Sequence, residues 1–565
     1  MKFSTTMPKF RYSAFAVSIW LCIGTPPNAH GSCTLTPTAG NDNYLCDSAS
    51  SGPLTDLSGD NTLTLPANGS GTITGNVTFG AGNDSVEMHS GLLAGTLNQG
   101  DGADRLTISA GQITGAVNQG NGVDDFNMTG GTLQSLAQGD SRDIFRMIGG
   151  TIFGAFEDGD TARMTGGSIG RVDMKLDNNL FDLSGGQILG NLVTGFGTDT
   201  IIVSGGRIGG NVSVSGGNDS IKMTGGEIAG EIRASAGDDT LLWDGGGIIH
   251  SAILMGEDND NAILRNLGES TLVLTPAIDG GNGNDLLTFD GTNSAGSDRY
   301  RNWETIRLNN GSRFDLDGPL RLGDSASGTG VFTIDASSTM TSAQGSITPF
   351  TAGQRATLSN AGVIDLSSGN TRTSDTLTVQ GNYSGRGGQL FLQSALGDDN
   401  SASDKLVVGD GTLTGNTLIS VTNLGGAGAL TRQNGIQLVQ AQGTAISNND
   451  AFALKGAVSA GAYDYRLFKG GVTAGSENSW FLRSAVVAPA VTTIPNPDPG
   501  LPPITVPVVA TPVAAPAPVG APAAGFASHR ARCRADCPLS SGSPDLVRAA
   551  AGGRAIDPRG FRHFP

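Results

Sequence analysis

The chain is poor in aromatic and charged residues and has no cysteine through most of its length. Of its 565 residues, 5% are Phe, Trp or Tyr and 15% are charged, and no cysteine lies between positions 47 and 532. A disulfide framework, a cysteine metal site and thiol catalysis are therefore excluded from the middle of the chain. The 34 Lys and Arg against 51 Asp and Glu give a net charge of −17, which disfavours nucleic acid as a partner because that binding needs clustered cations.

Glycine is abundant, with 87 residues, and it marks a repeat. Between positions 80 and 291 a phrase close to Gly-x-Gly-x-Asp returns about every 20 residues. After each phrase comes a small-Gly or Gly-Gly step, which ends at Gly91, Gly111, Gly131, Gly150, Gly167, Gly186, Gly206, Gly226 and Gly246. A fixed period of this length indicates units that bury their apolar face by stacking on their neighbours.

Each repeat alternates short period-2 runs with turns rich in Gly, Asn and Asp, which is typical of strands. Units of about 20 residues are too short for a sheet with helical crossovers. The sequence therefore predicts an all-β fold, a parallel β-helix with coils of about 20 residues. One predicted inward column is Val86, Leu106, Phe126, Phe145, Ile201, Ile221 and Leu241. The other is Ile113, Leu133, Ile152, Ile169, Ile188, Ile208 and Ile228.

The N-terminus has the features of a secretory signal. Residues 1–31 hold a basic start, an apolar segment and a small-x-small site, which predicts cleavage between Gly31 and Ser32. Since an exported chain meets an oxidising compartment, we expect a disulfide between Cys33 and Cys46.

The composition divides the rest of the chain. We expect an N-terminal cap and first coils at 32–79, regular repeats at 80–291, a β-helix continuation at 292–374, a densely packed section at 375–484, a disordered Pro-rich linker at 485–525, and a disordered Arg-rich tail at 526–565.

Residues 303–316, and above all 375–484, resemble the end of an autotransporter passenger of the pertactin-like and diffuse-adhesin-like kind. The matching text includes DTLTVQGNYSG, QLFLQSALGDDNSASDKLVV, NGIQLVQAQG, GAYDYRLFKG and WFLRS. The resemblance implies type V secretion, a right-handed β-helix, and an autochaperone-like role for 375–484. It also implies contact with the outer-membrane translocation machinery.

Members of that family end in an outer-membrane β-barrel, whereas strand alternation is missing after WFLRS. We therefore expect a chain without its barrel, either through truncation or a shifted frame or because the barrel is supplied separately. With a barrel the protein would reach the outer membrane and cell surface or be released; without one it would stay periplasmic.

An aspartate recurs at one position of the repeat. These residues, with the Asp of a calcium-type phrase GGNGNDLLT, are Asp84, Asp104, Asp124, Asp143, Asp199, Asp219, Asp239 and Asp285. Stacked carboxylates repel one another, and a bound calcium ion would relieve the repulsion. The alternative is that each Asp caps its own turn through an Asx bond. No other cofactor is expected.

The sequence favours an adhesin or interaction stalk without catalysis, whose partner is a host-cell or matrix protein or glycan. The alternative is a β-helix enzyme acting on polysaccharide or ester substrates. Ser325 lies in a hydrolase-like phrase, GDSASG, but no His motif accompanies it. Lys175, Arg207, Lys222 and Arg233 fall on different repeats. We therefore name no catalytic residue.

Overall fold

The computed structural model describes residues 32–369, 371–486, 491–494 and 504–507. The chain divides into two compact units, 1–488 and 489–565. The predicted signal, with Gly31, and the Arg-rich tail lie outside the described residues.

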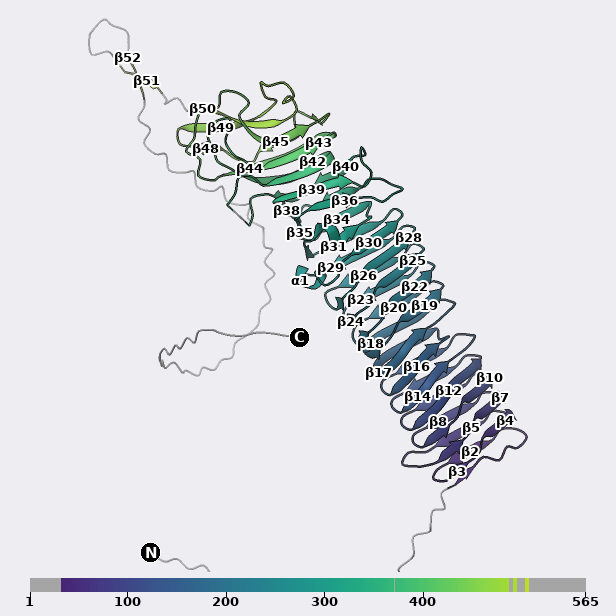
Figure 1. Cartoon of the computed structure of the whole chain (residues 1–565). Coiled ribbons are helices and arrows are strands. Elements are labelled where there is room, and N and C mark those ends of the chain that lie inside the picture. Colours follow the sequence, from purple (N-terminus) through teal and green to yellow (C-terminus); the bar gives the residue numbers. More distant parts are fainter. Residues whose placement is uncertain (1–31, 370, 487–490, 495–503, 508–565) are drawn as a thin grey trace, which may run out of the picture. The chain divides into compact units, whose positions relative to one another are not determined.

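The first unit is a right-handed parallel β-helix, drawn in Figure 1 as a stack of strands. A typical coil contains β10 (Leu97–Asp101), β11 (Arg105–Ile108) and the start of β12 (Gln112–Asn121). Each strand pairs in parallel with the equivalent strand one coil further on, so that Leu106 lies opposite Phe126. Each coil thus has three strand faces, one more than the two inward columns of the prediction.

Both predicted columns are confirmed, because their residues face one another in successive coils and are buried. The third column was missed because its strands mix one or two buried apolar residues with Gly, Asn, Gln and Ser, as in the sequences LNQGD of β10 and VSVSG of β22 (Val212–Gly216). Its members include Val77, Leu97, Val117, Leu136, Phe156, Val172, Leu192, Val212, Ile232 and Ile253.

The stack continues through the irregular parts of the sequence. β16 (Thr151–Glu157), β17 (Thr161–Asp173) and β18 (Leu180–Ile188) keep the parallel pairing where the Gly-x-Gly turn is lost. Beyond position 291 the same face continues, because β31 (Leu286–Asp290) pairs in parallel with β34 (Thr305–Asn309). A one-turn helix, α1 (Glu269–Leu272), projects from the side of the stack in Figure 1.

The C-terminal end of the first unit is built differently. β42 (Thr376–Ser394) is 19 residues long and β44 (Thr412–Asn423) is 12 residues long. The sheet then closes with antiparallel pairs between β45 (Ile436–Gln442), β50 (Trp480–Val486) and β49 (Tyr463–Lys469). Aromatic rings pack beneath it, with centroids 5.6 Å apart for Tyr383 and Phe452 and 5.5 Å apart for Phe452 and Trp480.

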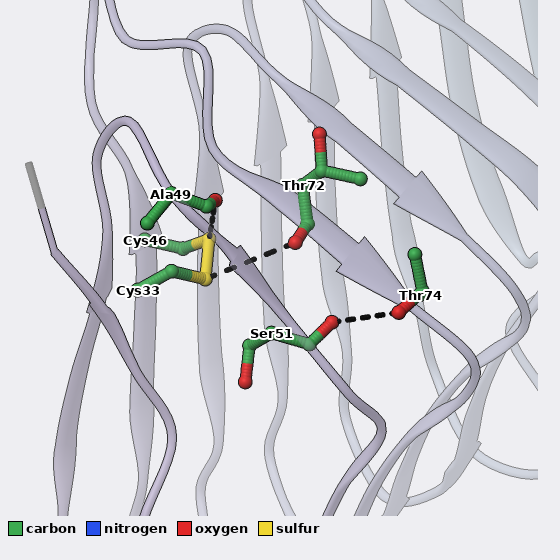
Figure 2. Close-up of a disulfide and its surroundings, with 6 residues drawn as sticks. All are labelled: Cys33, Cys46, Ala49, Ser51, Thr72 and Thr74. Atoms are coloured by element: carbon green, nitrogen blue, oxygen red, sulfur yellow. Dashed lines mark hydrogen bonds between the residues drawn. A yellow bond between two sulfur atoms is a disulfide. The ribbon is translucent and has the colours of Figure 1, made fainter.

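The N-terminal end carries the predicted disulfide. β1 (Cys33–Thr34) pairs antiparallel with β2 (Asn43–Cys46), which places the two cysteines opposite each other and joins them. Figure 2 shows the sulfur atoms beside the carbonyl oxygens of Thr72 and Ala49, each 3.9 Å away. The disulfide therefore joins β1 to β2 at the N-terminal end of the stack.

The second unit contains β51 (Val491–Ile494) and β52 (Ile504–Pro507), which pair antiparallel. They fall inside the segment predicted as a Pro-rich linker. Their β-branched sequences, VTTI and ITVP, account for the strands.

Candidate functional site

The eight predicted aspartates do stack, and they are buried rather than lying along an exposed edge. Each is 3% exposed or less. The Oδ1 of each ladder Asp accepts a hydrogen bond from the backbone N–H of the equivalent residue one coil earlier. The donor-acceptor distance is, for example, 2.7 Å from Asp84 N–H to Asp104 Oδ1 and 2.8 Å from Asp104 N–H to Asp124 Oδ1. The carboxyl thus joins two coils, which differs from the expected Asx bond within one turn.

The ladder is longer than the repeat phrase indicates. Five further members are Asn61, Asp160, Asn179, Asp260 and Glu304. The first run extends from Asn61 to Asp160 and the second from Asn179 to Glu304. The sequence signal for them was the spacing alone: Asn replaces Asp at the start of each run, Glu replaces it at the end of the second, and Asp160 and Asp260 are aspartates outside the regular phrase.

The second carboxyl oxygen of the ladder is left without a hydrogen-bond partner in the described structure. These buried Oδ2 atoms belong to Asp84, Asp104, Asp124, Asp143, Asp199, Asp219, Asp239, Asp260 and Asp285. Burial disfavours the charged form, which raises the pKa of Asp104 to about 7 and the pKa values of Asp143 and Asp260 to about 8. The carboxyls of Asp143 and Asp260 are therefore mostly neutral at pH 7.

Calcium would need six to eight oxygen ligands around one point. The ladder instead gives one oxygen of each Asp to a backbone amide. Within the described ranges, no three His, Cys, Asp or Glu side chains converge as metal ligands. The residues therefore do not form a calcium cage, and calcium binding stays a prediction.

The candidates for catalysis are not brought together. Ser325 is exposed in a turn where the Asp324 carboxylate accepts hydrogen bonds from the backbone of Ala326 and Ser327. Among the basic candidates, Lys175 pairs with Asp158, Arg207 with Glu227 and Arg233 with Glu231. These three pairs lie on separate coils, as the sequence indicated.

A groove interrupts the regular surface where the repeat spacing falls to 19 and 17 residues. Three residues separate the inward pairs Ile113/Val117 and Ile152/Phe156, but two separate Leu133/Leu136 and Ile169/Val172. The strand register shifts at each of these corners. The turn between the two inward residues is therefore one residue shorter in every second coil. Residues of these turns line a groove of about 710 Å³.

The lining of this groove, here called the corner groove, is mixed in character. Its walls include Asn118, Phe153, Gly154, Glu157, Arg171 and Asn191. Phe153 is 57% exposed, where neighbouring coils have Gln134 and Gly170 at the same corner. Arg171 forms an ion pair with Glu157. Sequence reasoning missed this site, although the shortened repeats marked it.

Comparison with known proteins places the C-terminal section. Residues 354–467 match the family model described as Autochaperone Domain Type 1. The match begins inside the segment predicted as β-helix continuation and ends before the predicted boundary at 484. The C-terminal section of the chain is that of an autotransporter passenger.

Relatives of this passenger include two named adhesins. It is 44% identical over 151 residues to the adhesin BmaC autotransporter of Brucella suis biovar 1 (strain 1330), covering 25% of the passenger and 4% of BmaC. It is 42% identical over 112 residues to the autotransporter adhesin AIDA-I of Escherichia coli, covering 20% and 8%. The matches thus span a small part of either relative.

Among solved structures, the passenger is similar to the Haemophilus influenzae Hap adhesin, with a TM-score of 0.38 and 15% identity over 76% of this chain and 64% of that chain. In the part of the passenger that the structure describes, no helix is both long and apolar enough to cross a membrane.

Proposed function

We propose that this passenger is an adhesion stalk of the bacterial surface, without catalysis, which binds a host-cell or matrix protein or glycan. The relatives named as adhesins support the adhesion role. We also propose that the passenger stays attached at the cell surface or is released from the cell.

The observation that carries the proposal is the corner groove. In a solenoid, inward residues are fixed by stacking and outward residues are free to vary. An aromatic ring that is 57% exposed contributes little to that stacking, and it stands in a groove of about 710 Å³. Exposed aromatic residues are enriched among those that anchor partners. The corner groove is therefore the proposed contact site.

Binding of the purified full-length chain to cultured host cells tests this function. We expect attachment that Phe153→Ala reduces and that Phe196→Ala does not. Phe196 is the matched control, since it is 65% exposed on a strand outside the groove lining. Absence of attachment by the unmodified chain would contradict the adhesion function. Equal loss in both variants would contradict the corner groove as its site.

The enzyme alternative has less support. The ladder carboxyls bond to backbone amides, and Ser325 lies in an exposed turn. We expect that incubation with acidic polysaccharides releases no oligomers and that a fluorophosphonate probe leaves Ser325 unlabelled. Release of oligomers or labelling of Ser325 would favour the enzyme.

A further inference from the structure

A side insertion of the β-helix is held rigid by a buried ion pair. Arg299 is 8% exposed, and its Nη2 donates to Glu269 Oε1 of α1 at 2.7 Å. The guanidinium also donates to the Ala295 carbonyl oxygen at 3.0 Å and to the Tyr300 hydroxyl at 3.3 Å. The Glu269 side chain is half-buried, so the pair is shielded from water mainly at its arginine, and both terminal nitrogens of the guanidinium have hydrogen-bond partners that fix its position.

A second set of hydrogen bonds ties the same insertion to the following coil. The Asp317 carboxylate accepts from the Ser297 N–H and hydroxyl, both at 2.9 Å, and from the Gly296 N–H at 3.2 Å. The segment 296–302 is therefore anchored at both ends. Such anchoring preorganises the side chains that it presents to solvent.

A hollow of about 270 Å³ lies between this segment and two strands, β36 (Pro319–Leu322) and β39 (Gln344–Pro349). Arg301 and Arg321 both line it, with Asn302, Thr348 and Phe350. Arg301 Nε donates to the Asp298 carbonyl oxygen at 2.9 Å, and the Arg321 guanidinium lies 5.5 Å from the centroid of the Phe350 ring. Both cations are thus oriented by contacts that leave their terminal nitrogens available.

The charge of the hollow points to an anion. Neither Arg301 nor Arg321 takes part in an ion pair of the described residues, and the one acidic residue of the lining, Asp298, is exposed. Among the lining residues two guanidinium groups thus stand against one carboxylate. A second carboxylate, Asp279, lies opposite Arg301 in the strand pairing but outside the lining, and its Oδ1 accepts from Asn302 Nδ2 and the Gly281 N–H. Like charges beside one another on a sheet are unfavourable, and an anion held between them removes that cost. Arginine binds carboxylate and sulfate groups with paired hydrogen bonds.

We propose that this hollow binds the carboxylate or sulfate group of an acidic saccharide. The Thr348 hydroxyl and the side-chain oxygen of Asn302 supply partners for sugar hydroxyls beside the charged group, while the Asn302 Nδ2 donates to Asp279 Oδ1 at 2.7 Å. The proposal rests on the adhesion function and names a ligand class for it, at a site separate from the corner groove.

Titration calorimetry on the full-length chain tests the site. The probes are a trigalacturonate, a sulfated lactose and unmodified lactose. We expect one or both acidic probes to bind and lactose not to bind. Arg301→Gln and Arg321→Gln should each weaken binding at least about tenfold, because each removes charge-assisted hydrogen bonds. Arg307→Gln is the matched control, since Arg307 is an exposed arginine of the neighbouring strand β34 outside the hollow.

Circular dichroism confirms that each variant folds. The trigalacturonate and sulfated-lactose titrations decide between a carboxylate and a sulfate ligand. Unchanged binding in both variants, or equal binding of lactose, would overturn the proposal. A chain that attaches to host cells but binds neither acidic probe retains the adhesion function and loses this site. A chain that binds an acidic probe but attaches to no cell retains the site and loses the adhesion function.

Discussion

The regular repeats and the C-terminal section bury acidic residues in different ways. In the repeats, Asp143 accepts one backbone hydrogen bond at Oδ1, and its buried Oδ2 has no hydrogen-bond partner in the described structure. In the C-terminal section, Asp404 accepts from the Asp375 N–H at 2.9 Å with one oxygen and from the Gln393 N–H at 2.6 Å with the other. Burial raises the pKa of Asp143 to about 8 but that of Asp404 to about 6. Asp143 is thus mostly protonated at pH 7, whereas Asp404, which is bonded at both oxygens, has the lower pKa of the two.

Strand pairing differs in the same two regions. Each strand of the repeats pairs with the coil before and the coil after, as β11 does with β8 (Ser85–Met88) and β13 (Asp125–Met128). In the C-terminal section, β42 alone pairs with five strands. The repeats can therefore grow by addition of single coils, whereas the C-terminal section has the long-range pairing of a unit that folds as a whole.

The largest predicted effect is a loss of stability of the repeats as the pH rises. A ladder Asp with a raised pKa keeps in the folded state a proton that the unfolded chain releases above about pH 4. Its contribution is complete below pH 4 and is lost as the pH passes through about 6 to 8, where Asp124, Asp104 and Asp143 titrate. Urea unfolding at pH 5 and pH 8 should therefore show a less stable rod at pH 8.

Asp143→Asn sharpens this test, because the amide keeps an acceptor oxygen but cannot ionise. It should reduce the difference in stability between pH 5 and pH 8. Asp140→Asn, at an exposed carboxylate of the same turn, should leave that difference unchanged. Equal stability of the unmodified chain at the two pH values would show that the ladder does not carry these protons.

The next effect is expected at the aromatic cluster of the C-terminal section. Trp480 is 4% exposed, and its Nε1 donates to Ser447 Oγ at 2.8 Å. Trp480→Ala should destabilise this section by about 3–5 kcal/mol and lower the refolding yield of the whole chain after dilution from urea. Trp243→Ala leaves a comparable cavity in the repeats, where Trp243 is fully buried. If Trp243→Ala lowered the refolding yield as much as Trp480→Ala, the two regions would not differ in their role.

A smaller and local effect is expected at the N-terminal end. Replacing both Cys33 and Cys46 by serine removes the disulfide that joins β1 and β2. The first coils should lose at most about 3 kcal/mol of stability, since the closed loop is short. Hydrogen exchange should rise in residues 32–79 and stay unchanged beyond 100. Faster exchange throughout the repeats would contradict stacking that depends on nearest neighbours.

The smallest effect is expected from calcium. We propose that the ladder folds without it, because one oxygen of each carboxyl accepts from a backbone amide and burial raises the pKa of the carboxyls, which lowers their negative charge. Thermal melts with calcium and with a chelator should coincide. A higher melting temperature in calcium would restore the ion as a structural ligand of the repeats.

The sequence predicted the fold because a solenoid repeats its signal. Leu106, Phe126 and Phe145 recur at one spacing, and stacking makes each such position visible many times. The third column escaped because its strands mix one or two buried apolar residues with Gly and polar residues, as at Leu97. The polar neighbours make the sequence of such a strand resemble that of a loop.

The sites were harder to predict than the fold. The Asp positions were found by their period. Their burial was not, because it depends on turns that close over the side chains, and the alternation of apolar and polar residues does not indicate such turns. The corner groove arises from the loss of single residues near Ser135 and Arg171, and its depth depends on neighbouring coils. The hollow at Arg301 and Arg321 joins residues that are 20 apart in a part of the chain without a clear repeat.

Hydrogen exchange of the full-length chain in increasing urea at pH 7 tests most directly whether the two regions differ as described. We predict that residues 80–291 lose protection at lower urea than residues 376–486, which should remain protected as one unit. Loss of protection at the same urea concentration in both regions, or first in 376–486, would contradict the account.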